Sequence, residues 1–364
     1  MRILIRLIIG LSLVVVFFFI IAFSFQRAGE ESRPGKKRGS DKGIYVTAWV
    51  AQTPARFNYL KAQAKKAGIN TIVVDGKDIL SRPLVELAKE KKLGPDTKVS
   101  ADPWLSKLAY NLHKDGFIVT VRLVVFKDDH LIIARPDLAV KIKGGGIYRD
   151  NKGGRWADPY SDEVRLYNAL VAERAALSGA DEVQFDYIRF PAEGRARDAY
   201  YSFEKQGVSK VDIINSFLKA VRERTSKYNV SIAVDIFGVT AWQSRSDIEN
   251  LGQDLKKMAQ YIDVLSPMFY PSHFHYGYDG YANPGAYPYH FVNSGVRRTK
   301  ELLSGEAVAI VPWIQGFDLR SPNFGPRYIM EQVRACRDEG VDSFLIWNAR
   351  NVYDVSFSAL IKGR

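Results

Sequence analysis

Apolar residues along this chain follow two patterns, short β-rich runs and longer stretches with the spacing of an amphipathic helix. The helical stretches have clear start signals, such as the Asp-Pro pair at Asp158 and the Ser-x-x-Asp sequence that begins at Ser209. The β-rich runs are residues 43–50, 69–76, 117–126, 182–190, 231–238, 264–271, 308–316 and 343–349. Eight strands alternating with helices over about 320 residues predict a closed (β/α)8 barrel, or TIM barrel.

A doubly wound open sheet is the alternative architecture for alternating strands and helices. That fold carries a glycine-rich phosphate-binding turn after its first strand. Residues 48–57, with the sequence AWVAQTPARF, follow the first predicted strand and contain no glycine. The barrel is therefore the favoured prediction.

The N-terminus has a different character from the rest of the chain. Leu7 to Phe25 form a run of 19 uncharged residues, preceded by Arg2 and Arg6. Roughly 20 apolar residues suffice to span a bilayer, and signal-peptide cores are usually shorter. We therefore expect a transmembrane anchor or signal segment over residues 1–26.

A polar linker over residues 27–42 is expected to join this segment to the barrel domain, residues 43–364. Arginines and lysines lie on both sides of the apolar run, so the positive-inside rule gives a mixed signal. We expect membrane attachment through the N-terminal helix, with the barrel outside the cytoplasm. The protein would instead be secreted if the segment is cleaved, for example after Ser24.

Composition and charge exclude several classes of protein. The chain of 364 residues is 46% hydrophobic and 25% charged, so it can bury a large core. The net charge is +12, and the first 42 residues supply five of these charges. No basic stripe with interleaved aromatic residues appears, so no nucleic-acid partner is predicted. The single cysteine, Cys336, excludes a disulfide within the chain.

One predicted strand carries a carboxylate in an otherwise apolar run. In the sequence DEVQFDYIRFP, residues 181–191, Val183 and Phe185 suit the helix layer, which leaves Gln184 and Asp186 pointing into the barrel. The same alternation on the next strand points Asp235 inward at its upper end. Because adjacent strands lie roughly 4.8 Å apart, the two carboxylates could approach to about 5–6 Å.

Two carboxylates at this spacing are the minimal machinery for hydrolysing a glycosidic bond. One acid protonates the leaving oxygen while the other attacks or stabilises the anomeric carbon. We expect Asp186 to be the nucleophile or charge stabiliser and Asp235 the acid/base, in a retaining reaction that uses no cofactor and no metal. The structural alternative is that one or both carboxylates are partners of Arg122, Arg189 or Lys77.

Other carboxylates compete for the second catalytic role. Asp75 ends the second predicted strand, and Asp318 follows the seventh; we rank both behind Asp235. Either could alternatively bind sugar hydroxyls. Further substrate-binding candidates share a place in or just beyond a predicted strand, and these are Arg122, Gln184, Arg189, Tyr270, His273, Trp313, Gln315 and Trp347.

The segment after the sixth predicted strand is unusually aromatic. Residues 269–291 contain nine Phe and Tyr residues together with three histidines. Such rings offer flat apolar faces to a sugar, or they form a lid that buries its own rings. His273 and His275 with Asp279 could bind a metal, but such a pair is more often hydrogen-bonded. Trp49, Trp313 and Trp347 at strand ends are either an aromatic floor or core.

Six sequence stretches together resemble a known family. They are VVFKDDHLIIARPDLAVK, DPYSDEVRLYN, FDYIRFP, VDIFG, SPMFYPSHF and WIQGFD. The combination is similar to the putative glycoside hydrolase domain family of bacterial and archaeal proteins, over roughly residues 43–352. The resemblance implies a TIM barrel related to the retaining α-amylase-type and α-galactosidase-type clans, with Asp186 matching the presumed nucleophile. This chain has DGKD at residues 75–78, where the family pattern would be DVKD.

The functional prediction is therefore a glycoside hydrolase acting on a poly- or oligosaccharide, with a carbohydrate as its partner. Two alternatives from other classes stay open. The first is a carbohydrate-binding or scaffold barrel at the cell envelope that has lost turnover. The second is a metal-dependent hydrolase, which would need ligands beyond His273 and His275 in a chain that has five histidines.

Overall fold

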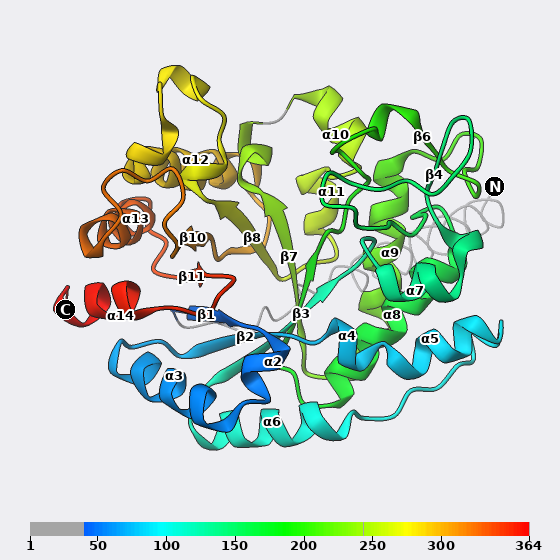
Figure 1. Ribbon diagram of the computed structural model, residues 1–364, viewed down its shortest axis with the longest axis horizontal. Helices are drawn as coiled ribbons and strands as arrows, with labels where there is room; N and C mark the ends of the chain where they lie inside the picture. The colour runs from blue at the N-terminus through cyan, green and yellow to red at the C-terminus, as the bar shows by residue number, and fades with distance from the viewer. Residues whose placement is uncertain (1–39, 243, 364) are drawn as a thin grey trace, which may run out of the picture. The chain divides into compact units, whose positions relative to one another are not determined.

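The computed structural model describes residues 40–242 and 244–363. In this part of the chain, eight parallel strands close into a ring. Helices lie outside the strands (Figure 1). The predicted (β/α)8 barrel is therefore confirmed. The strands, in order around the ring, are β1 (Lys42–Val46), β2 (Thr71–Asp75), β3 (Ile118–Val124), β5 (Glu182–Asp186), β7 (Ser231–Phe237), β8 (Val264–Phe269), β10 (Trp313–Gln315) and β11 (Phe344–Trp347).

Two pairings complete the ring, and one of them joins its last strand to its first. Strand β10 pairs with β8 through Trp313 and Met268, and β11 pairs with β1 through Leu345 and Gly43. The short β9 (Ala309–Ile310) pairs with the start of β8 just before β10 begins. Outside the ring, β4 (Lys141–Ile142) and β6 (Ala199–Tyr200) form a small antiparallel pair.

The helices follow the strands in the order expected of β/α units. They are α2 (Ala48–Ala51), α3 (Pro54–Lys66), α4 (Lys77–Leu80), α5 (Arg82–Lys89), α6 (Pro103–Lys114), α7 (Asp129–Ala134), α8 (Asp162–Leu177), α9 (Lys210–Thr225), α10 (Arg245–Leu251), α11 (Leu255–Ala259), α12 (Pro288–Leu302), α13 (Pro326–Asp338) and α14 (Asp354–Lys362). Short 3-10 turns precede or join several of them, at η1 (Pro136–Leu138), η2 (Ala196–Asp198), η3 (Gly238–Trp242), η4 (Pro271–His273), η5 (Tyr278–Gly280) and η6 (Pro284–Ala286).

Local sequence signals start the long helices where the structure has them. Ser209 caps α9 by accepting a hydrogen bond from the amide of Asp212, whose carboxylate in turn accepts from the amide of Ser209. Ser161 caps α8 by accepting a hydrogen bond from the amide of Val164, so this helix begins at Asp162 and not at the predicted Asp-Pro start of Asp158. The predicted Ser-x-x-Asp start is thus a complete capping box.

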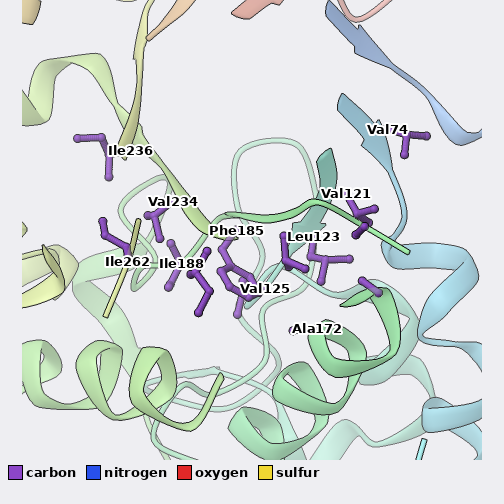
Figure 2. Packing of buried hydrophobic residues seen from close by; sticks show 14 of the residues in the cluster. Val74, Val121, Leu123, Val125, Ala172, Phe185, Ile188, Val234, Ile236 and Ile262 are labelled. Carbon is purple, nitrogen blue, oxygen red and sulfur yellow. The ribbon is translucent and has the colours of Figure 1, made fainter. Parts of the chain in front are cut away.

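The alternation of side chains divides the core into two layers. The outward-facing strand residues, among them Val74, Val121, Phe185 and Val234, pack against the helices (Figure 2). The inward-facing residues form a separate cluster inside the ring, which includes Tyr45, Val73, Ala233, Trp313 and Leu345. The inner layer is therefore where Asp186 and Asp235 belong by parity.

Two predicted strands end four residues earlier than expected. The first was expected to run to residue 50, but Thr47 caps α2 by accepting a hydrogen bond from the amide of Val50. This turns Trp49 outward, where it is 65% exposed, so its prediction as a barrel-floor or core residue is wrong. The fourth was expected to reach residue 190, but Tyr187 has a φ of 52° and stops β5 at Asp186.

The departure from the family pattern at residue 76 has a packing reason. A Cβ atom on Gly76 would lie 2.5 Å from Cγ1 of Val121 and 3.1 Å from Cδ1 of Leu80. The next residue, Lys77, is buried, with its Nζ 3.0 Å from the carboxylate of Asp128 and also bonded to the carbonyl of Val124. In this chain the turn after β2 therefore packs directly on β3.

The N-terminal predictions fall outside the described residues. The anchor or signal segment at residues 1–26 and most of the linker, through residue 39, are not described. Within residues 40–242 and 244–363, none of the helices has both the length and the apolar character needed to cross a bilayer.

Candidate active site

The upper ends of β2, β3, β5 and β7 bring charged side chains together. Register pairs Asp75 with Arg122 across β2 and β3. It also pairs Phe185 with Val234 across β5 and β7, so the next residues, Asp186 and Asp235, are level on neighbouring strands. Because neighbouring strands lie about 4.8 Å apart, the two predicted catalytic carboxylates start from adjacent backbone positions.

Arg122 is the centre of this group. It forms an ion pair with Asp186, and its Nη1 lies 2.6 Å from Asp75 Oδ1. Its Nε lies 4.0 Å from Asp235 Oδ2. Burial alone would lower the pKa of Arg122, but Asp75 and Asp186 raise it well above the ordinary value. One fixed positive charge thus serves three carboxyl groups.

Aromatic rings complete the surroundings of Arg122. The guanidinium carbon lies 5.2 Å from the ring centroid of Trp347 and 5.8 Å from that of Tyr45. These two rings stack on each other with centroids 4.0 Å apart, and the Tyr45 hydroxyl donates to Asp75. Asp75 is therefore a partner of Arg122 and Tyr45 in this structure. The ion pair of Asp186 with Arg122 is the contact that the structural alternative for Asp186 and Asp235 predicted.

Both oxygens of Asp186 accept hydrogen bonds. Arg122 donates to Oδ2, and the backbone amide of Tyr187 donates to Oδ1 over 2.7 Å. Tyr187 itself adopts the left-handed conformation that ends β5. A tyrosine at positive φ costs free energy and persists only where the surrounding structure holds it. Such strained residues are found most often at functional sites.

Asp235 has a less polar environment than Asp186. Its side chain is 1% exposed, and Trp313 Nε1 donates to its Oδ1 over 2.7 Å. Burial and the negative charge of Asp186 raise the pKa of Asp235 well above its usual range, against the opposing effects of Arg122 and Trp313. Two neighbouring carboxyl groups are thus placed in different environments, which is how one becomes an acid and the other an anion.

A cavity of about 600 Å³ lies directly above these groups. It is lined both by buried side chains such as Asp235 and by exposed residues such as Lys152 and Val239, so it connects the inner layer to the surface. Its size is that of a small-molecule site. Eight of the predicted site residues line it, namely Arg122, Asp186, Arg189, Asp235, Tyr270, His273, Trp313 and Trp347.

Four predicted site residues do not line this cavity. Asp75 lies beside it as a partner of Arg122, while Asp318 is exposed after β10. Gln184 faces inward two residues below Asp186, where its Nε2 lies 3.2 Å from Ser266 Oγ. Gln315 is fully buried and binds the amide of Ser272. Contact of these four with a substrate stays a prediction.

The structure adds charged residues that sequence reasoning missed. Lys127 and Asp150 line the cavity and form an ion pair at 2.6 Å. Glu193 also lines it, 2.6 Å from a nitrogen of Arg189. These residues come from the long loops after β3 and β5, where no period in the sequence indicates which side chains turn inward. The available signal was the unusual length of those loops.

The aromatic segment after β8 lines the cavity with some of its rings and packs others on one another. Phe274 and Tyr270 line the cavity. Other rings pack on one another, as in the pair Phe274 and Phe291, with centroids 4.6 Å apart. Tyr276 is 62% exposed. The segment therefore forms one wall of the cavity and buries four of its nine rings, those of Phe269, Tyr270, Phe274 and Phe291.

The histidines of this segment are hydrogen-bonded to protein groups. His273 Nδ1 lies 3.1 Å from Ser272 Oγ, and the Nδ1 atom of His275 lies 2.9 Å from the carbonyl of Tyr276. Asp279, the third candidate ligand, lies 2.8 Å from His290 Nε2. Across the described ranges, no three His, Cys, Asp or Glu side chains are grouped so that they could hold a metal ion.

Comparison with known proteins places this arrangement among related sequences and folds. A family model described as a putative glycosyl hydrolase domain matches residues 43–353. No curated protein matches the chain. A hypothetical protein from Ruminiclostridium thermocellum ATCC 27405 is 31% identical over 53% of this chain and 96% of its own, with a TM-score of 0.42.

Two more distant structures share the fold over most of the described chain. The PgaB (BpsB) glycoside hydrolase domain from Bordetella bronchiseptica is 13% identical, covers 89% of this chain and 98% of its own, and has a TM-score of 0.59. The β-galactosidase from the psychrophilic Marinomonas ef1 is also 13% identical, with coverages of 89% and 58% and a TM-score of 0.60. At these identities the similarity concerns the fold.

Proposed function

The chain belongs to the family described as a putative glycosyl hydrolase domain. We propose that it hydrolyses an O-glycosidic bond of a saccharide that binds between the carboxyl groups of Asp186 and Asp235. The observation that carries the proposal is the pairing of these two carboxyl groups. They end adjacent strands at the same level, line one cavity and have different surroundings. Retaining glycosidases use two carboxyl groups of this kind, about 5–5.5 Å apart.

In the first step, Asp186 attacks the anomeric carbon while the protonated Asp235 gives its proton to the leaving oxygen. The C–O bond to the leaving group breaks as the bond from Asp186 to the sugar forms. The raised pKa of Asp235 supports the acid role, because the group keeps its proton until attack.

In the second step, Asp235 is a carboxylate and removes a proton from water, which attacks the anomeric carbon. The bond between Asp186 and the sugar breaks, and both carboxyl groups return to their starting states. Two displacements at the same carbon retain the anomeric configuration. Arg122 stays bound to Asp186 throughout as a fixed counter-charge.

The test is hydrolysis by the full chain of a panel of polysaccharides and aryl glycosides, followed by release of reducing ends or aryl alcohol. We expect Asp186→Asn and Asp235→Asn each to lose at least about 100-fold in kcat. Asp342→Asn is the matched control, since Asp342 is 74% exposed, precedes β11 and does not line the cavity. NMR of the first-formed product should show the anomer of the substrate, and inversion would reject the retaining mechanism.

A second candidate is a carbohydrate-binding barrel without turnover. The observation that favours it is that both carboxyl groups already accept hydrogen bonds from the protein. Arg122 and Tyr187 donate to Asp186, and Trp313 donates to Asp235. This function predicts saccharide binding, but no reducing ends from the wild-type chain. Binding by Asp186→Asn at wild-type affinity would support it further.

The place of action is also a proposal. The apolar run from Leu7 to Phe25 supports a membrane-attached or exported protein, and we propose an envelope or exported glycan as the substrate. Fractionation of cells that carry the full chain, followed by protease treatment of intact cells, tests this. A barrel that stays with the cytosol would reject it.

A further inference from the structure

Tyr270 stands directly after β8, at the edge of the cavity that holds Asp186 and Asp235. Its ring packs edge-on against His273 and Phe317, with centroids 5.1 and 5.6 Å away. The residue is 5% exposed and belongs to the cluster inside the barrel. The ring is therefore fixed, and the hydroxyl has a defined position.

The hydroxyl of Tyr270 is unusual among the described tyrosines. It is buried and has no hydrogen-bond partner among the described residues. Two other buried tyrosines are paired: Tyr167 donates to Asp128 over 3.1 Å, and Tyr353 donates to the carbonyl of Tyr45. A buried hydroxyl without a partner costs stability, so an unpaired one beside a cavity indicates a partner that arrives with a ligand.

The neighbouring carboxyl groups are already engaged by other donors. Asp186 accepts from Arg122 and Tyr187, and Asp235 accepts from Trp313. Burial first, and then the charges of Asp235 and Asp186, raise the pKa of Tyr270 well above its ordinary value, so the hydroxyl keeps its proton and is a donor. An oxygen acceptor placed between the two carboxyl groups would meet this donor.

We propose that the Tyr270 hydroxyl touches the substrate and donates a hydrogen bond to an oxygen of the sugar bound between Asp186 and Asp235. This inference rests on the proposed hydrolysis of glycosides. It assigns a third substrate-contacting group, supplied by β8, to a site whose carboxyl groups come from β5 and β7. The acceptor is a neutral sugar oxygen, either a hydroxyl or the ring oxygen.

Tyr270→Phe in the full chain tests the proposal, because it removes the hydroxyl and keeps the packed ring. We expect kcat/KM for the best glycoside of the panel to fall about 10- to 100-fold. The midpoint of thermal unfolding without ligand should stay equal or rise, since an unpaired buried hydroxyl is removed. Tyr167→Phe is the matched control; it should unfold at a lower temperature and keep wild-type kinetics, because its hydroxyl is paired outside the cavity.

Each outcome decides one of the two proposals. If the wild type turns over and Tyr270→Phe stays within twofold of it, the Tyr270 contact is rejected and hydrolysis stands. A lower unfolding temperature for ligand-free Tyr270→Phe, comparable with that of Tyr167→Phe, would also reject the contact. Saccharide binding without turnover rejects hydrolysis. In that case a weaker affinity of Tyr270→Phe for the saccharide supports the contact, and wild-type affinity rejects it. Neither turnover nor saccharide binding by the wild type rejects both.

Discussion

Arg122 on β3 and Asp186 on β5 form an ion pair inside the barrel, at the base of the cavity. Asp186, the candidate nucleophile, lies on β5 between Arg122 on β3 and Asp235 on β7. The positive charge of Arg122 also forms an ion pair with Asp75. Both the stability of the barrel and the proposed chemistry are therefore expected to depend on the guanidinium of Arg122. This coupling gives the first prediction.

We expect Arg122→Met to lower the free energy of unfolding by about 3–5 kcal/mol, because it leaves Asp75 and Asp186 as neighbouring carboxylates without their buried counter-charge. Urea unfolding followed by circular dichroism measures the change. Arg245→Met is the control, since Arg245 is 93% exposed and its pair with Glu249 contributes less than about 1 kcal/mol. A loss below about 1 kcal/mol for Arg122→Met would show that Asp75 and Asp186 do not need the charge of Arg122 to be stable in the folded protein.

The raised pKa of Asp235 predicts the alkaline side of the pH–rate profile. The general acid works only when protonated, so turnover is present below this pKa and falls as the pH rises through it. Asp235→Asn should remove that fall and lower kcat by roughly 10²- to 10⁴-fold. Substrates with good leaving groups should lose less, because they need less proton donation in the first step. An unchanged alkaline limb in Asp235→Asn would assign the acid to another group.

Asp158 predicts how stability depends on pH. It is fully buried and accepts from the amides of Tyr160 and Phe203 over 2.9 and 3.3 Å. Burial raises the pKa of Asp158 to about 6, against the opposing effect of the backbone amides. The folded state thus binds this proton more tightly than the unfolded chain, whose aspartates have a pKa near 3.9.

Stability from Asp158 is therefore fully present below about pH 4 and is lost as the pH rises through about 6, by at most roughly 3 kcal/mol. We expect Asp158→Asn to shrink the difference in unfolding free energy between pH 4 and pH 7 relative to the wild type. Chemical denaturation at both pH values measures it, with Asp318→Asn as an exposed control. Equal pH dependence in the wild type and Asp158→Asn would show that burial does not perturb this carboxyl group.

The period of two along the strands was enough to locate the centre of the site. Val183 and Phe185 had to face the helices, so Asp186 had to face inward, and the same reasoning placed Asp235. Parity alone gives no height along the barrel, however. Gln184 also faces inward but lies two residues below Asp186. Its side chain hydrogen-bonds to Ser266 and does not line the cavity.

The remaining features depend on tertiary contacts and on local backbone geometry. The left-handed Tyr187 follows a β-rich stretch whose propensity continues past it, so the end of β5 was hidden. Lys127 and Asp150 meet because a long loop folds back over the barrel, and their separation of 23 positions carries no period. The sequence does not show that the Tyr270 hydroxyl lacks a hydrogen-bond partner among the described residues, because this depends on which groups the fold places around it.

Gly238 gives the last prediction, at the junction between β7 and the cavity wall. A Cβ atom there would lie 2.4 Å from the carbonyl oxygen of Met268, on β8. This contact is with backbone, so relief requires β7 and β8 to move apart. Asp235 lies on β7, three residues before Gly238, and Tyr270 follows the end of β8, two residues after Met268.

We expect Gly238→Ala to destabilise the protein by about 1–3 kcal/mol and to lower turnover, because the strand shift displaces Asp235 relative to its neighbours. Gly94→Ala is the matched control, since a Cβ atom on Gly94 meets no heavy atom within 4 Å. That substitution should leave stability unchanged or raise it by up to about 1 kcal/mol, because it restricts the unfolded chain. Unfolding and turnover are measured on both variants. If Gly238→Ala behaves like Gly94→Ala, β7 and β8 can separate without cost, and the close approach at Met268 does not position the site.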